Sequence, residues 1–130
     1  MPKKKYRKIL KKQKWNWQIK FYHNRVSGHF LLGVAKRGDY IAGHDMTTHP
    51  SLKNNGKPRK RYLELSENPN PNDIRPSFIY KKLRKDIRVH FEDTLQKRLS
   101  LRKGWKLTKA DKRRIKKLDK KQIKSPHNSI

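Results

Sequence analysis

The sequence lacks cysteine and has few acidic or apolar residues. Among 130 residues there is no cysteine, 10 acids stand against 37 lysines and arginines, and hydrophobic residues make up 32%. The missing cysteine excludes disulfides, cysteine-ligated zinc and thiol catalysis. The length and the low apolar fraction leave material for a single domain with a small core.

Long apolar runs are missing as well. No stretch approaches the roughly 18 consecutive apolar residues that suggest a membrane-spanning helix, so we expect no membrane partner. The N-terminal stretch 1–12 has the positive charges of a signal peptide, but no apolar segment follows them. We therefore expect a cytoplasmic protein, or a nuclear one in a eukaryote.

Positive charge is abundant and is concentrated at the two ends. The formal net charge is +27; residues 1–20 carry nine basic residues and no acid, and residues 97–124 carry fourteen basic residues and two acids. The middle of the chain is close to an ordinary domain. The predicted parts are a basic N-terminal arm at 1–14, a compact β-rich core at 15–103, a basic C-terminal helix at 104–124 and a tail at 125–130.

Glycines and polar clusters divide the middle of the chain into short apolar runs. The runs 30–32 and 40–42 lie on either side of Gly38, which predicts a hairpin of two strands. A further strand is predicted at 62–65. Polar loops are expected on both sides of it, at 53–58 and 68–73.

Beyond Ser77 the apolar spacing fits two structures. Apolar residues at every fourth position suit one face of a helix, but alternation around Val89 suits a strand. We favour short strands at 77–80 and 86–91, followed by a helix over 92–102.

The clearest helix signal lies near the C-terminus. Thr108 can cap a helix, and Asp111 three residues later completes a capping-box pattern. The helix should run to about Lys124, with a thin apolar side formed by Ile115, Leu118 and Ile123. The sequence thus predicts an α+β fold: a small strand-rich core, SH3-like or a partly open barrel, with a basic N-terminal arm and a basic C-terminal helix.

The charge predicts a polyanionic partner, because a chain this basic would otherwise repel itself. Binding through phosphates should be steeply salt-dependent, since each neutralised phosphate releases counterions. RNA is the expected partner, ahead of duplex DNA. The residues expected to contact it are Lys3, Lys4, Lys5, Arg7, Lys8, Lys11, Lys12, Trp15, Trp17, Arg25, Arg37, Lys112, Arg113, Arg114, Lys116, Lys117, Lys120 and Lys121.

Aromatic residues follow the N-terminal lysines directly. Trp15 and Trp17 could stack on unpaired bases, as recognition of single-stranded RNA requires. The same alternation, continued by Ile19 and Phe21, also describes the inward face of a first strand, because alternation is first of all a feature of strands.

The densest polar group lies between Gly43 and Ser51. RNA can be cut without a metal when its 2′-hydroxyl attacks the neighbouring phosphate, which requires a base, an acid and donors for the developing charge. Histidine suits both proton transfers near neutral pH. The predicted catalytic residues are His44, Thr47, Thr48, His49 and Lys53.

Two other interpretations of this segment stay open. The polar side chains could simply hold a loop through hydrogen bonds to the backbone. His44, Asp45 and His49 could in principle bind a metal, but their spacing matches no standard ligand pattern. We predict no metal and no cofactor.

The order of these segments resembles the small barrel of endoribonuclease toxins. It consists of a strand Phe30-Leu31-Leu32-Gly33-Val34, a strand Tyr40-Ile41-Ala42, the stretch Asp45-Met46-Thr47-Thr48-His49-Pro50-Ser51, a polar loop, and a strand Tyr62-Leu63-Glu64-Leu65. The likeness is to toxins of type III toxin–antitoxin systems and to the related MazF/PemK group. It covers about residues 29–91.

This resemblance implies metal-independent cleavage of RNA. Thr47 and Thr48 would supply the hydroxyls and Lys53 the lysine of the Thr-Ser-Pro-Lys stretch found at the active site of such toxins. An antitoxin RNA or protein would then be a partner.

The two basic ends favour a different class of function. Extensions of this kind fit a non-catalytic ribosomal or ribosome-associated RNA-binding protein, in which they thread between RNA helices. A DNA-binding accessory protein of a mobile element, with the terminal helix in a groove, is a third possibility.

Overall fold

Seven antiparallel strands and one helix make up the part of the chain that the structure describes. The structure is a computed structural model that describes residues 14–25, 27–88 and 99–123. The elements are β1 (Asn16–Asn24), β2 (Phe30–Arg37), β3 (Tyr40–Thr47), β4 (Tyr62–Glu64), β5 (Phe78–Tyr80), β6 (Arg84–Arg88), β7 (Leu99–Leu101) and α2 (Lys109–Gln122). The predicted strand-rich α+β class is confirmed.

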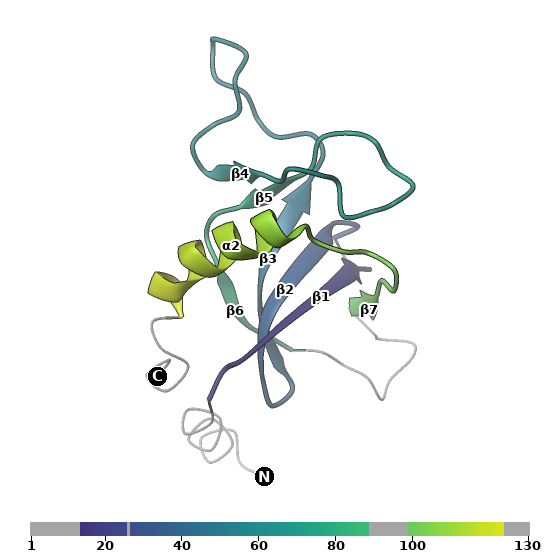
Figure 1. Ribbon diagram of the computed structural model, residues 1–130, viewed down its shortest axis with the longest axis vertical. Helices are drawn as coiled ribbons and strands as arrows, with labels where there is room; N and C mark the ends of the chain where they lie inside the picture. The colour runs from purple at the N-terminus through teal and green to yellow at the C-terminus, as the bar shows by residue number, and fades with distance from the viewer. Residues whose placement is uncertain (1–13, 26, 89–98, 124–130) are drawn as a thin grey trace.

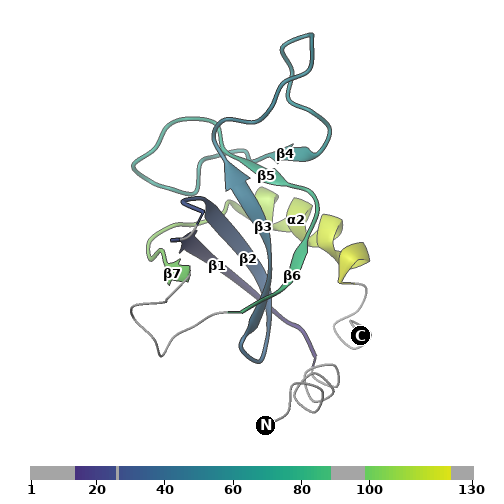
Figure 2. The same ribbon diagram turned by 180° about the vertical axis from the view of Figure 1, so that it is seen from behind.

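The strands form one sheet in the order β4-β5-β3-β2-β1-β7. The predicted hairpin is confirmed: β2 and β3 are joined at Gly38, whose positive φ of 59° suits a tight turn. The other edge of β3 pairs with β6 near its start and with β5 at its end. Figure 1 shows α2 lying across one face of this sheet, and Figure 2 shows the sheet from the opposite side.

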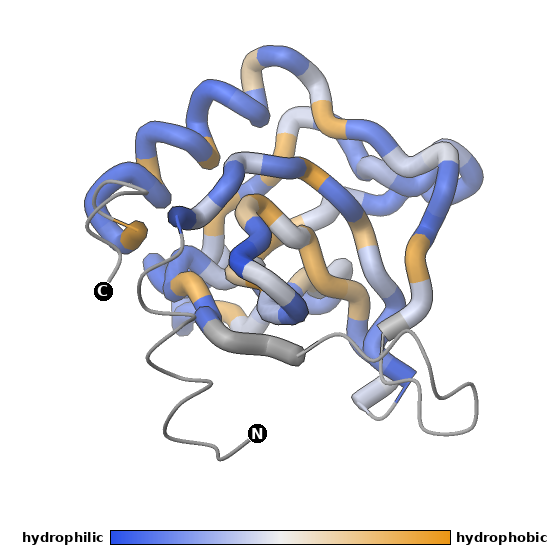
Figure 3. The backbone as a smooth tube through the Cα atoms, turned by 90° about the horizontal axis from the view of Figure 1, so that it is seen from below, coloured by the Kyte–Doolittle hydropathy of each residue, from blue (hydrophilic) through white to orange (hydrophobic). Residues whose placement is uncertain are grey.

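The sheet bends sharply where two glycines face each other. Gly33 and Gly43 are paired across β2 and β3, and the register shifts beside this pair between Gly33 and Ala35. A Cβ on Gly43 would lie 2.7 Å from the carbonyl oxygen of Leu32, and a Cβ on Gly33 would lie 3.0 Å from the Tyr22 ring. Glycine and the bulge together therefore permit the close approach that curves the sheet around its core (Figure 3).

The C-terminal helix begins as predicted. Thr108 is its N-cap, and the Thr108 hydroxyl accepts a hydrogen bond from the backbone N–H of Asp111. The Asp111 carboxylate, however, accepts from the backbone N–H and the hydroxyl of Ser66, so it ties the helix to the end of β4. The helix ends at Gln122, close to the predicted end.

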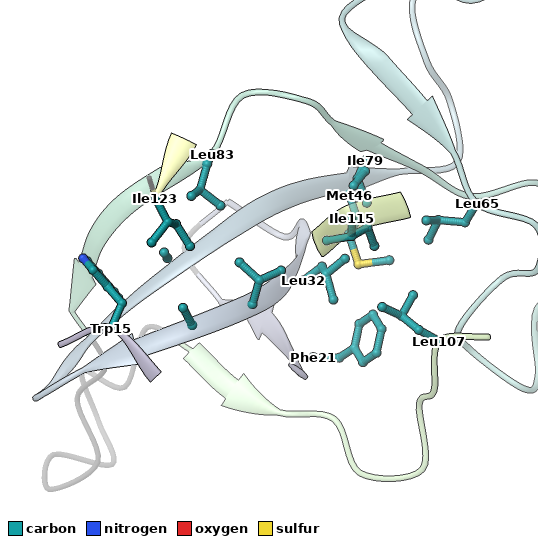
Figure 4. Close-up of a cluster of buried hydrophobic side chains, with 13 residues drawn as sticks. Trp15, Phe21, Leu32, Met46, Leu65, Ile79, Leu83, Leu107, Ile115 and Ile123 are labelled. Atoms are coloured by element: carbon teal, nitrogen blue, oxygen red, sulfur yellow. The ribbon is translucent and has the colours of Figure 1, made fainter. Parts of the chain in front are cut away.

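A buried stripe at every fourth residue attaches this helix to the sheet. Its members are Asp111, Ile115, Asp119 and Ile123, each at most 1% exposed. Ile115 and Ile123 join the main core with residues of every long strand (Figure 4): Trp15, Phe21, Leu32, Val34, Ala35, Ala42, Met46, Leu65, Ile79, Leu83 and Leu107. Most other residues of the helix are exposed, and the hydropathy colouring of the backbone shows the helix as mainly hydrophilic (Figure 3).

One predicted element is wrong where it can be compared. Of the helix expected over 92–102, residues 92–98 lie outside the described residues, and Leu99–Leu101 form β7. This strand pairs with the end of β1, from Tyr22 to Asn24. Pairing with an open sheet edge satisfies backbone groups that an isolated turn of helix would leave to water.

The predictions for the two ends of the chain cannot be compared with the structure. The N-terminal arm at 1–14, apart from Lys14, and the tail at 125–130 lie outside the described residues. In the described parts of the chain, no helix combines the length and the apolar character needed to cross a membrane.

Candidate functional site

His44 lies in the core, not at the surface. Its side chain is fully buried; Nδ1 lies 2.7 Å from the backbone oxygen of Tyr80, and Nε2 lies 2.8 Å from both carboxylate oxygens of Asp119. These two contacts hold the ring between the backbone of Tyr80 and the Asp119 carboxylate of α2. The prediction that His44 acts on RNA is wrong, because no solvent-facing atom of its ring remains.

Three other residues of the predicted catalytic site lie together in a cleft. Thr47, Thr48 and His49 line a cleft of about 400 Å³ at the end of β3. The Thr47 hydroxyl accepts the backbone N–H of His49 at 3.0 Å, and the Thr48 hydroxyl lies 3.0 Å from His49 Nδ1. These bonds fix the turn that carries the exposed imidazole.

Lys53 is not part of this cleft. It lies in the following loop, where its backbone N–H donates to the carbonyl of Lys57 and its carbonyl accepts from Gly56. The ammonium is not among the groups that line the cleft. The geometry therefore gives no support to Lys53 as the lysine of the site.

The opposite wall comes from the polar loop at 68–73 and its continuation. Asn68 and Asn70 line it together with Asp73 and Arg75. The Arg75 guanidinium donates through Nε and Nη2 to the Asp73 carboxylate, the shortest of these bonds being 2.7 Å. Hydrogen bonding from Arg75 lowers the pKa of Asp73 to about 2, so this carboxylate is charged at neutral pH.

This arrangement leaves one edge of the arginine available. Arg75 is 57% exposed, and within the described residues its Nη1 makes no hydrogen bond. Because Asp73 fixes the plane of the guanidinium, Nη1 is presented in a defined direction. A phosphate oxygen is a suitable acceptor for it.

Aromatic side chains form the apolar end of the cleft. Phe30 and Trp105 line it, with ring centroids 4.6 Å apart, and both are partly buried. His29 lines the cleft beside them, following the turn at Gly28. An unpaired base can stack on such a surface, whereas a paired base cannot reach it.

A tyrosine of the cleft, Tyr80, contacts Tyr62, which does not line the cleft. Tyr80 lines the cleft, and its ring centroid is 4.8 Å from that of Tyr62. The Tyr62 oxygen accepts a hydrogen bond from the backbone N–H of Ser51 at 3.1 Å, and it lies 3.0 Å from the Ser51 hydroxyl, to which it is also hydrogen-bonded. These two bonds are the main reason that the pKa of Tyr62 falls to about 8, while the bond that Tyr80 donates to Tyr62 raises the pKa of Tyr80.

The residues predicted to contact RNA fall into three groups: buried in the core, accessible at the surface, and outside the described residues. Trp15 and Arg37 are buried, at 1% and 6% exposure, with the guanidinium carbon 4.4 Å from the centre of the Trp15 ring. The prediction that they contact RNA is wrong for this reason, and the alternation of Trp15 with Phe21 is a core feature. Trp17 is half-buried and Arg25 is exposed.

All the lysines and arginines of α2 are at the surface. The predicted contacts of the N-terminal arm cannot be compared with the structure. The exposed cations of α2 are Lys109, Lys112, Arg113, Arg114, Lys116, Lys117, Lys120 and Lys121, of which Arg114 pairs with Asp111. Lys3, Lys4, Lys5, Arg7, Lys8, Lys11 and Lys12 lie outside the described residues. The basic helix therefore presents a continuous cationic surface.

Sequence reasoning missed the far wall of the cleft. Arg75 and Tyr80 belong to one short segment and Trp105 to another, both far in the sequence from Thr47, and no local pattern connects them. Phe30 is predicted from the sequence only as part of a strand, and no pattern marks its neighbour His29. Among the described residues, no group of three or more histidines and acids is placed to hold a metal ion.

Comparisons with protein-family models, with curated proteins and with solved structures give no match to this chain.

Proposed function

We propose that this protein binds single-stranded RNA in the cleft beside β3 and cleaves it without a metal ion. The observation that carries the proposal is the meeting of Thr47, Thr48 and His49 with Arg75 and with the Phe30–Trp105 surface in one open cleft. It combines a proton-transfer group, hydroxyl donors, a cation and a stacking surface, which are the elements that cleavage by the 2′-hydroxyl requires.

In the proposed reaction a base stacks on the aromatic end and its phosphate lies near Arg75. His49 takes the proton of the 2′-hydroxyl, the 2′-oxygen attacks phosphorus, and the bond from phosphorus to the 5′-oxygen breaks. His29, which also lines the cleft, gives a proton to the departing 5′-oxygen. The products are a 2′,3′-cyclic phosphate and a 5′-hydroxyl.

The proposal includes the finer points of the fold. We propose that the curved sheet is a partly open, SH3-like small barrel of the toxin type, which the bulged Gly33–Gly43 crossing supports. We also propose that the basic ends guide RNA to the cleft by long-range attraction. The exposed cations of α2 support this role.

The same cations support a second candidate, a non-catalytic ribosomal or ribosome-associated RNA-binding protein. Its basis is that Asp73 already neutralises much of the Arg75 charge, so the cleft would hold RNA without stabilising a reacting phosphate well. In this candidate the cleft still binds an unpaired base.

Variants of the cleft test the proposal and separate the two candidates. A labelled single-stranded RNA is incubated in excess chelator with wild type, Thr47→Ala/Thr48→Ala and His49→Ala. We expect cleavage to fall by about 10²-fold or more in both variants, with RNA affinity nearly unchanged. Thr47→Ser/Thr48→Ser is the matched control, because it keeps both hydroxyls and should retain cleavage.

Other outcomes are equally informative. Cleavage that survives in both alanine variants would refute the proposed site. Binding without cleavage by the wild type would favour the non-catalytic candidate. Comparing Lys53→Ala with Lys57→Ala in the same loop shows whether Lys53 has any role that its neighbour lacks.

A further inference from the structure

A second hollow lies on another side of the molecule, between β1 and α2. Its volume is about 310 Å³, and it is lined by Trp17, Gln18, Ile19, Val34, Lys112, Arg113, Ile115 and Lys116. None of these residues lines the cleft at the end of β3. We call this hollow the β1–α2 groove.

The groove lies where the pairing of β1 with β2 is irregular. Their register shifts between Trp17 and Lys20, so β1 has one residue more than β2 over this stretch. A bulge of this kind bends the strand that carries it. The groove lies beside this bulge, with the buried residues Val34 and Ile115 at its floor.

The floor of the groove is aliphatic and aromatic. Val34 and Ile115 are buried at 0% and 1% exposure, and Trp17 and Ile19 pack against the core while remaining partly accessible. An apolar surface of this kind gains free energy when another apolar side chain covers it.

The rim of the groove is positively charged. Lys112, Arg113 and Lys116 are exposed on α2, and within the described residues no acidic side chain forms an ion pair with them. The two acids of the helix point the other way, into buried contacts with Ser66 and His44. The rim therefore has no internal counter-charge.

We propose that the β1–α2 groove is a docking site for an acidic segment of a partner protein, with apolar side chains on the floor and carboxylates at the rim. The groove matches such a segment in both charge and polarity, and the net charge of +27 favours it further. A second copy of this chain, or its own basic N-terminal stretch, would bring like charge to the same rim.

A nucleic acid fits the groove less well. A base on this floor would bury polar edges that need both donors and acceptors, whereas the polar groups here are cations at the rim and the amide of Gln18. The cleft beside β3, with its Asn, Thr and Arg side chains, offers such partners. The proposal is thus independent of the RNA activity assigned to that cleft.

Fluorescence anisotropy with synthetic peptides tests this assignment on the full-length protein. The probe is a labelled short peptide of alternating leucine and glutamate. The control peptides alternate leucine with glutamine, and serine with glutamate. We expect the probe to bind, and both controls to bind markedly more weakly, because each lacks one of the two complementary features.

Two triple variants of α2 place the peptide on the molecule. Lys112→Glu/Arg113→Glu/Lys116→Glu reverses the rim, and Lys117→Glu/Lys120→Glu/Lys121→Glu makes the same change in charge outside the groove. All six residues are exposed, so both proteins should fold, which thermal unfolding verifies. We expect about tenfold weaker peptide binding in the rim variant and little change in the other.

Several results would overturn the proposal. Equal weakening by the two triple variants would show general attraction to a basic protein, and no binding of the probe would show no docking site. If single-stranded RNA displaces the peptide and the rim variant loses much more RNA affinity than the other triple variant, the groove binds nucleic acid instead. If the rim variant changes the oligomeric state by light scattering, the groove joins two copies.

Discussion

At the scale of single residues, the buried pair of His44 and Asp119 is the strongest polar link between sheet and helix. Both side chains are 0% exposed, so removing one partner leaves the other as a buried polar group without this hydrogen bond. We expect His44→Ala or Asp119→Ala to lower the free energy of unfolding by about 3–5 kcal/mol. Chemical denaturation of the purified variants measures this loss.

An exposed ion pair provides the matched control for that prediction. Arg84 and Asp45 are 3.0 Å apart, but their side chains are 51% and 31% exposed. Asp45→Ala should therefore cost about 1 kcal/mol or less. Similar losses in Asp45→Ala and Asp119→Ala would contradict the importance given to the buried pair.

A second residue-scale prediction concerns the titration of Tyr62. Hydrogen bonds from Ser51 lower the pKa of this phenol to about 8, from an ordinary value of 10.0. Between these two values the folded protein has lost a proton that the unfolded chain still holds. The interaction therefore stabilises the fold increasingly as pH rises from about 8 towards 10, and this gain is lost as pH falls through 8.

Spectrophotometric titration of the phenols measures this shift. One tyrosine should ionise near pH 8 in wild type; this step should be absent in Tyr62→Phe and move towards higher pH in Ser51→Ala. A wild-type curve without an early step would refute the geometry described for Ser51 and Tyr62.

The positions of some of these residues could be predicted from the sequence. Ala42, His44 and Met46 alternate along a strand, so the inward position of His44 could have been inferred from its neighbours. Asp111 and Asp119 are the two acids of a very basic segment, and they share a helix face with Ile115. That they would meet Ser66 and His44 could not be inferred, because those contacts depend on the tertiary fold.

At the scale of elements, the crossing of β2 and β3 depends on Gly43. A Cβ there would lie 2.7 Å from the carbonyl oxygen of Leu32, and a strand backbone cannot move away without breaking its pairing. We expect Gly43→Ala to destabilise the protein by about 3 kcal/mol. Thermal or chemical unfolding provides the measurement.

Gly56→Ala is the control for this prediction. Gly56 has a φ of +80°, but a Cβ there would meet nothing within 4 Å. Its cost should be limited to backbone strain, about 1 kcal/mol. If Gly43→Ala cost no more than Gly56→Ala, the close approach of the two strands would be disproved.

Elements with their own local signals could be predicted from the sequence, and those without could not. Gly38 marked the hairpin and Thr108 marked the start of α2, because turns and caps depend on a few adjacent residues. Leu99–Leu101 had a helix-like spacing instead, and their pairing with β1 is a contact between distant parts of the chain. The same holds for the candidate site. Thr47, Thr48 and His49 are neighbours in the sequence and could be predicted together, whereas Arg75 and Trp105 come from distant parts of the chain.

At the scale of the whole molecule, the charge should control the affinity for RNA. The helix α2 alone exposes eight lysines and arginines, and the net charge is +27. The logarithm of the affinity for single-stranded RNA should fall linearly with the logarithm of salt concentration, by about 0.7 per phosphate contacted. Titrations at several salt concentrations measure the slope.

Charge reversal should change this slope in a predictable way. Reversing the charge of Lys117, Lys120 and Lys121 should reduce the slope if these side chains contact phosphates. The affinity of the β1–α2 groove for the peptide should not change. An affinity that does not depend on salt would contradict a phosphate-binding surface.

The central claim is that the cleft beside β3 cleaves RNA through its own 2′-hydroxyl. The most direct test is to incubate the protein, in excess chelator, with a single-stranded RNA whose cleavage site has been mapped, and with the same RNA carrying a 2′-deoxynucleotide at that site. The account predicts 2′,3′-cyclic phosphate ends from the first RNA and no cleavage of the second. Intact RNA in both reactions, or equal cleavage of both, would contradict it.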